Sequence, residues 1–333
     1  MYFLLGFALI FSLLLAINVF WSIAAEIVWR AASPVFKNIS ARSRAQIIFA
    51  LSVLPFAAAL VFVVAFLLPA YLLFEPQKSD EVISFKLALL TFVSLTGIGF
   101  ALFRVFKTRQ TTRRLLLDWL RNAERIEIEN ISIPVYSIKH QFPVVAVVGT
   151  FRPRMFIARQ ILESLDAEEF RAVIAHEYGH LVNHDNLKRT VLRVCRDLLV
   201  FPLGKTLERA WSEDAESAAD EFAARKGGNP AAVNLASALV KIARIAPQNA
   251  SPAMPSGTFL IGENNAHITR RVQQLLHLAG SLNSHRKIPF LNPAFFSKLG
   301  FTLLFIAVFL LVINYDFLFQ VHRMLETFVA LIQ

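Results

Sequence analysis

Four uncharged, apolar segments divide this chain of 333 residues, and each is about as long as a helix that crosses a bilayer. They cover residues 2–25, 46–74, 87–103 and 299–315. The third extends back to about residue 82 if the Lys86 side chain reaches toward the membrane surface. The sequence therefore predicts transmembrane helices over about residues 2–29, 46–74 and 82–103, and a fourth that begins near residue 299.

The charges between these segments predict how the chain is oriented. Lysine and arginine outnumber aspartate and glutamate by 34 to 24. Cations without acids fill the first loop, acids predominate in residues 75–81, and five cations follow the third segment in residues 104–114. The positive-inside rule then places residues 104–298 in the cytoplasm and both termini outside. We expect contact with the lipid bilayer and not with nucleic acid, since no arginine-aromatic motif or recognition helix is evident.

Residues 104–298 contain no further span and are long enough to form a domain with its own core. Strand-forming residues in three short segments predict a small antiparallel sheet, and amphipathic patterns with caps predict several helices. The strands are expected in residues 126–136, 144–148 and 155–158, and the helices in residues 108–125, 167–182, 187–200, 206–225, 231–244 and 267–278. The predicted fold class is mainly α: four transmembrane helices, a cytoplasmic α+β domain, and a short outer tail within residues 299–333.

The sequence HEYGH at residues 176–180 is the motif that carries chemistry. Its two histidines are one helical turn apart, so both imidazoles can bind one metal ion. The glutamate beside them can accept a proton from a water that the metal activates. The motif predicts one Zn²⁺ per chain, with His176 and His180 as ligands and Glu177 as the catalytic base. The alternative interpretation is a solvated, charged helix face.

A catalytic zinc takes a third protein ligand, which the spacing alone does not identify. His184 lies about 12 Å along the helix axis from His176, too far to share an ion. Residue 186, where metzincins have their third histidine, is Asn186. An acidic cluster at residues 213–220 remains, in which Glu216 and Asp220 share one helix face. Either this cluster supplies the third ligand, or it is an ordinary solvated surface of a helix.

Several segments resemble the integral-membrane gluzincin peptidases, in particular the peptidase module of BlaR/MecR-type β-lactam sensor and antirepressor proteins. The HtpX and CAAX prenyl protease family is a more distant relative with the same ligand pattern. The resemblance implies a zincin-like domain in which His176, His180 and Glu216 bind zinc, Glu177 is the base and Asp220 orients a ligand histidine. The similar segments are FRPR at residues 151–154, DAEEFRAV at 166–173, HEYGH followed by Asp185, and ExxxD at 216–220.

The resemblance implies a zinc endopeptidase in the bacterial cytoplasmic membrane that cuts proteins or peptides at the cytoplasmic face, in signalling or protein quality control. His267 and Arg271, in a weaker signature at residues 267–272, are candidates for contact with substrate or oxyanion, as are Arg270 and Tyr178. The strand at residues 144–148 or that at 155–158 can pair an extended substrate. The β-lactam sensors continue into an extracellular penicillin-binding domain, whereas residues 316–333 are short, so we expect no drug sensing by that route.

Two other function classes are weaker. A signalling receptor or scaffold with a structural or latent zinc site is the main alternative, but such a site has no need of Glu177. A transporter has little support, because intramembrane polar residues are few and no inverted repeat is evident. The sequence predicts neither the substrate nor the oligomeric state.

Overall fold

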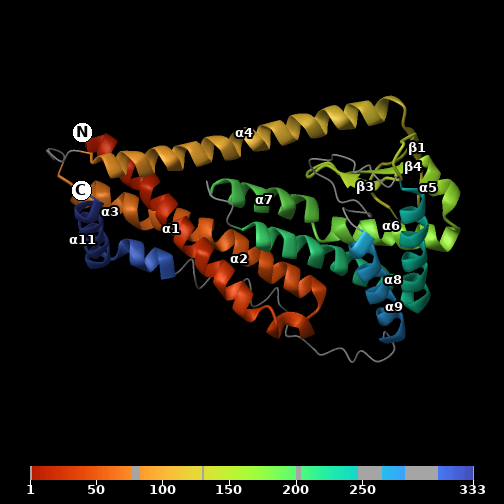
Figure 1. The fold of residues 1–333 in the computed structure, drawn as a ribbon. Helices are drawn as coiled ribbons and strands as arrows, with labels where there is room; N and C mark the ends of the chain where they lie inside the picture. Colours follow the sequence, from red (N-terminus) through yellow and green to blue (C-terminus); the bar gives the residue numbers. More distant parts are fainter. Residues whose placement is uncertain are drawn as a thin grey trace.

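The computed structural model describes residues 2–76, 83–129, 131–199, 204–246, 265–281 and 307–332. Long helices form one end of the molecule, and a small sheet with its covering helices forms the other (Figure 1). Three helical segments are long and apolar enough to cross a membrane: Tyr2–Ala32, Ala41–Phe74 and Phe85–Arg121. They contain the first three apolar segments, so the protein is a multi-pass membrane protein.

Helix α1 (Tyr2–Ala32) packs against α2 (Ala41–Val61) and α4 (Phe85–Arg121). Buried hydroxyl groups join α1 to α4: Ser12 Oγ lies 3.1 Å from Thr91 Oγ1, and Thr91 also donates to the Ala8 carbonyl at 3.1 Å. Such hydrogen bonds help to hold membrane helices together, because lipid tails are as apolar as the helix surfaces. The helix expected over residues 108–125 is the second half of α4.

The second span is irregular at its prolines. Helix α2 contains Pro55 and passes into the π-helical segment η2 (Phe62–Leu67) and then α3 (Leu68–Phe74), whose first turn contains proline. Proline has no N–H to donate, and the wider turns of a π segment relieve the clash of its ring with the preceding turn. The span thus departs from a regular α-helix as a π segment next to Pro69.

The fourth predicted span lies partly outside the described residues. Its described part is a helix over Ala307–Ile313, and a second helix over Tyr315–Ala330 follows at an angle of 82°. Helix α11 (Tyr315–Ile332) packs against α3 and η2, where Leu318 and Val321 lie in one buried cluster with Phe66. The segment expected as a short tail is therefore a helix that packs back onto the second span.

Strands β1 (Glu124–Ile126), β2 (Val135–Ile138), β3 (Val145–Val148) and β4 (Arg154–Ala158) form one sheet in the order β1-β2-β4-β3. The antiparallel prediction is confirmed for β1–β2 and β3–β4 but wrong for β2–β4, which are parallel. After β2 the chain skips one strand position and forms the edge strand β3. It then turns back and forms β4 in the position between β2 and β3. The return turn contains Gly149, whose φ of 106° disfavours a side chain.

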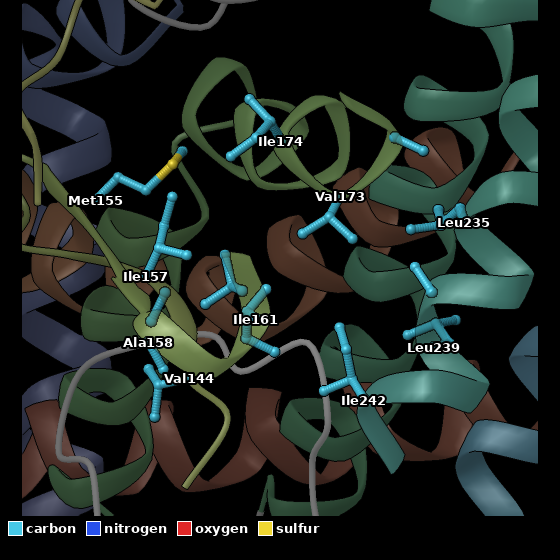
Figure 2. Packing of buried hydrophobic residues seen from close by; sticks show 14 of the residues in the cluster. Val144, Met155, Ile157, Ala158, Ile161, Val173, Ile174, Leu235, Leu239 and Ile242 are labelled. Atoms are coloured by element: carbon cyan, nitrogen blue, oxygen red, sulfur yellow. The ribbon is translucent and has the colours of Figure 1, made fainter. Parts of the chain in front are cut away.

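Helices α5 (Arg159–Ser164), α6 (Ala167–Val182) and α8 (Lys205–Ile245) pack with this sheet around one apolar core. Figure 2 shows Ile157 of β4, Ile161 of α5, Val173 of α6 and Leu239 of α8 converging in it. The backbone of α8 is non-helical at Gly228, where φ is 74°, so α8 consists of two helices joined at a kink, as predicted on either side of this glycine. Helices α7 (Asp185–Asp197) and α9 (Asn265–Ser281) complete the described part of this end.

Candidate metal centre

Helix α6 carries the HEYGH motif and begins at a capping box formed by Asp166 and Glu169. Asp166 accepts a hydrogen bond from the Glu169 N–H at 2.9 Å, and the Glu169 carboxylate accepts from the Asp166 N–H at 3.1 Å. Glu169 also accepts from Ser237 and from Lys241 of α8, each at 2.7 Å. The capping box fixes where α6 begins, and the two extra bonds attach this end of the helix to α8.

Small residues let α6 and α8 approach closely at the motif. A Cβ added at Gly179 would lie 3.2 Å from Ala219 Cα and 3.3 Å from Phe222 Cβ, so glycine fits there with little room to spare. Ala219 is itself wholly buried. This contact brings the helix face that contains Glu216 and Asp220 against the face that contains both histidines.

Three side chains meet at this contact. One ligand atom from each of His176, His180 and Glu216 lies within 4.8 Å of the other two. The two Nε2 atoms are 3.2 Å apart, and the Glu216 oxygens lie 3.6 Å from Nε2 of His176 and 3.7 Å from Nε2 of His180. Ligand atoms of a tetrahedral zinc with bonds of about 2.0–2.1 Å are separated by about 3.3 Å. All three side chains are buried.

The second nitrogen of each histidine faces a carboxylate. His176 Nδ1 lies 2.9 Å from Asp220 Oδ1, and His180 Nδ1 lies 2.7 Å from Asp185 Oδ2. These carboxylates favour a proton on Nδ1 of each histidine. Each Nε2 then carries a lone pair, and the two lone pairs point toward one another and toward Glu216. Lone pairs and a carboxylate that converge in a buried space repel one another unless a cation lies between them. The donor set therefore fits a zinc ion.

A sequence model of the BlaR1 peptidase M56 family matches residues 75–275, which is more than half of the chain and contains this site. The chain belongs to the BlaR1 peptidase M56 family. Protease HtpX of Photorhabdus laumondii is 28% identical over 130 residues. That similarity covers 37% of this chain and 44% of HtpX, so the chain spans less than half the length of this curated relative. Both findings confirm the resemblance that the motifs indicate.

In this member of the family, Glu177 is wholly buried beside the ligands. Burial raises the pKa of Glu177 to about 8, and the negative charge of Glu216 adds to this effect, whereas His180 and Arg271 oppose it. A carboxyl group whose pKa lies near neutrality can both accept a proton from water and release it again.

Arg271 from α9 contacts the acidic residues of the site and is itself buried. Its Nε and Nη2 donate to the two Asp220 oxygens at 2.9 and 2.7 Å, and its Nη1 lies 3.3 Å from Glu216 Oε2. Burial alone would raise the pKa of Glu216, but His180, His176 and Arg271 outweigh burial and hold that pKa well below its ordinary value. Glu216 is therefore ionised, as a zinc ligand must be.

The other candidates for contact with substrate have different partners. His267 is half-buried one turn before Arg271, and burial together with Arg270 and Arg271 lowers its pKa. Arg270 pairs with Glu213 at 2.9 Å, and the Tyr178 ring lies 4.8 Å below Lys226 Nζ. Arg271 is thus the candidate that the structure brings into contact with the acidic residues of the site.

The two strands proposed for substrate pairing differ in position. β4 is paired on both sides, by β2 and β3, so the interpretation of residues 155–158 as a substrate-pairing strand is wrong. β3 is at the edge of the sheet, which leaves residues 144–148 as the remaining candidate. Asn186 already donates to the carbonyls of Val147 and Gly149, at 2.9 and 3.2 Å.

The contact of Asp185 with His180 was not predicted, although the acid was noted in the motif. The chain leaves α6 through His184, whose φ of 54° reverses its direction, and Asp185 then begins α7. Helical spacing does not describe such a turn, so an offset of five residues gives no sign of contact. The only available signal was an acidic residue directly after a helix that contains a metal motif.

Proposed function

We propose that this protein is a membrane-anchored, zinc-dependent endopeptidase that hydrolyses peptide bonds of protein substrates at the cytoplasmic face of a bacterial inner membrane. The observation that carries the proposal is the buried group of His176, His180 and Glu216, with Glu177 beside it. Family membership supports the same chemistry. One zinc ion per chain would bind to these two histidines and Glu216.

When bound, zinc lowers the pKa of a water and polarises the substrate carbonyl as a Lewis acid. Glu177 accepts the proton of the attacking water and then delivers it to the leaving amine. Asp220 and Asp185 hold the two imidazoles in the tautomer that leaves Nε2 free to bind metal. These side chains are buried, so the proton transfer takes place away from bulk water.

Arg271 acts by holding Asp220 and Glu216 in place, since its guanidinium nitrogens face these two carboxylates. His267 is the remaining candidate for contact with the oxyanion of the substrate, because it is half-buried one turn along α9. An extended substrate would add to the outer edge of β3. The Asn186 amide already uses the Val147 carbonyl, so pairing with a substrate there needs either another β3 carbonyl or displacement of Asn186.

Peptide cleavage by the Glu177→Gln variant tests the proposal. The purified full-length protein with zinc is assayed against a broad peptide library, and bound metal is measured in parallel. We expect the variant to keep its zinc and to lose about 10²–10⁴-fold in cleavage rate, the usual contribution of a general acid–base group. Glu168→Gln, on the exposed side of the same helix, is the matched control and should cleave normally. Equal cleavage by wild type and Glu177→Gln would refute the assigned base.

The cytoplasmic location is supported by the cations of the first loop and of residues 104–114. It is tested by labelling single introduced cysteines in intact cells with a membrane-impermeant maleimide. Cysteine at Ser33 or Arg121 should be protected until the cells are broken, while the buried Cys195 gives little background. Labelling of either position in intact cells would reverse the proposed orientation.

A further inference from the structure

An open cleft of about 790 Å³ lies between α4, α7 and the turn that joins β3 to β4. Figure 1 shows α4 passing above α7 on its way from the membrane helices to the sheet. The two helices are in contact, so the cleft has two firm walls. It does not include the metal ligands or Glu177.

Cations line both walls of this cleft. Helix α4 contributes four and α7 contributes two: Arg104, Lys107, Arg109, Arg113, Arg193 and Arg196. The single carboxylate of the lining, Asp197, lies 3.0 Å from Arg104 and 2.9 Å from Arg196. Within the described residues, no carboxylate lies within 4 Å of Lys107, Arg109 or Arg113. The α7 cations Arg193 and Arg196 also face Glu208 of α8, so the surplus of positive charge that the described part of the chain does not neutralise lies on the α4 wall.

The α7 wall adds charge in a place with restricted access to water. Arg193 of this wall lies 3.7 Å from Glu208 of α8, but burial and the neighbouring Arg189 outweigh that carboxylate and lower the pKa of Arg193. An anion bound in the cleft would relieve this unfavourable interaction. The surplus charge of the α4 wall acts in the same direction.

The position of the cleft along α4 decides what kind of anion fits. Residues 87–103 of α4 are uncharged and span about 25 Å at 1.5 Å per residue, close to the thickness of the hydrocarbon core. Arg104 therefore lies at the boundary between hydrocarbon and headgroups. Apolar side chains, Val105, Leu116, Leu187 and Val194, share the lining with the cations. This combination suits an amphiphile better than a fully hydrated ion.

We propose that the cleft between α4 and α7 binds the phosphate-bearing headgroup of an anionic phospholipid from the adjacent leaflet. The cations bind the phosphate, and the apolar side chains nearest to Arg104 (Val105 and Val194) contact the start of an acyl chain. A free phosphate ion shares part of this chemistry, but it would leave the apolar part of the lining unused. The site is separate from the metal centre, and its test does not depend on peptidase activity.

Lipid binding to the full-length protein in a mild detergent tests this. After delipidation, the protein is titrated with phosphatidylglycerol, phosphatidylcholine or inorganic phosphate, and bound lipid is counted by native mass spectrometry. We expect phosphatidylglycerol to bind at least 10-fold more tightly than phosphatidylcholine. The triple variant Lys107→Gln, Arg109→Gln, Arg113→Gln should bind it roughly 100-fold more weakly, since each cation near an anionic headgroup contributes about 5-fold.

The matched control removes three exposed cations that do not line the cleft: Arg114→Gln, Arg121→Gln, Arg125→Gln. It should bind phosphatidylglycerol within about 3-fold of wild type. A measurement on the wild-type protein alone should show binding that weakens as salt rises. Equal binding of the two lipids, an equal loss in both triple variants, or displacement of the lipid by 1 mM inorganic phosphate would overturn the proposal. So would binding of an acidic peptide without binding of the lipid.

Discussion

The close contact between α6 and α8 makes Gly179→Ala an informative substitution. The added Cβ would lie 3.2 Å from Ala219 Cα and 3.3 Å from Phe222 Cβ, whereas ordinary carbon contacts are about 3.5–4.0 Å. The helices must separate by roughly 0.5 Å to restore such contacts. A metal site tolerates deviations of only about 0.2 Å, and the contact lies between the histidines and Glu216. Zinc affinity should therefore fall by at least about 10-fold.

The free energy of unfolding should change less than the zinc affinity. Overpacking a core costs about 1–3 kcal/mol, while alanine favours a helix over glycine by about 1 kcal/mol. The metal-free variant should thus lose no more than about 2 kcal/mol of stability. This partial cancellation separates an effect on the zinc site from general unfolding.

The assay measures the zinc dissociation constant by competition with a chelating dye, and the thermal midpoint of the metal-free protein in the same detergent. Gly99→Ala is the matched control, because Gly99 is also within a helix and nothing lies within 4 Å of its added Cβ. The control should bind zinc as wild type does. If Gly179→Ala also bound zinc with unchanged affinity, the distance between α6 and α8 would not be what positions Glu216.

Three further outcomes are expected. Asp185→Asn should raise the zinc dissociation constant about 10–100-fold, because His180 loses the carboxylate 2.7 Å from its Nδ1; an unchanged constant in the dye assay would exclude that role. Glu169→Gln should cost about 1–2 kcal/mol at pH 7, since bonds from Lys241 and Ser237 outweigh burial and lower the pKa of Glu169. Because the folded-state pKa of Glu169 is lowered, its ionised form stabilises the fold fully above the ordinary value of 4.5 and progressively less as pH falls below that value. Denaturant unfolding should therefore show a smaller difference in the free energy of unfolding between wild type and Glu169→Gln at pH 4 than at pH 7. Removing zinc with a chelator should lower the thermal midpoint reversibly. Compared with protein in free zinc at 100 times the dissociation constant, the metal-free protein should lose about 2.7 kcal/mol in free energy of unfolding. A midpoint unaffected by zinc would contradict a site that joins two helices.

The helices of the site were predictable because their signals are local. The capping box at Asp166 and Glu169, the one-turn spacing of His176 and His180, and the apolar runs of the spans each depend on residues close in sequence. The distance from Glu216 to the histidines depends on how two helices pack. Spacing therefore left Glu216 as one alternative among others, and the family resemblance supplied the assignment.

The features that sequence reasoning missed all depend on how the chain changes direction. The parallel pairing of β2 with β4 arises because β3 lies beyond β4 at the sheet edge, which no single strand pattern shows. The contact of Asp185 depends on the left-handed conformation of His184. The bend of 82° before α11 likewise follows from packing against the second span, not from the amphipathic pattern alone.

The helix that supplies Glu216 is also attached to a membrane span. Arg44 of α2 donates to Asp214 at 2.7 Å, and Trp211 is buried in a cluster with Ile48 of α2. These contacts lie within about a turn and a half of Glu216, whereas the histidines belong to α6, which packs against the near half of α8 at Gly179 and is fixed to the far half through Glu169. A shift of α2 relative to α6 would therefore act directly on the distance between Glu216 and the histidines. A metal site divided between two such helices is sensitive to the arrangement of the spans, because zinc tolerates displacements of only a few tenths of an ångström.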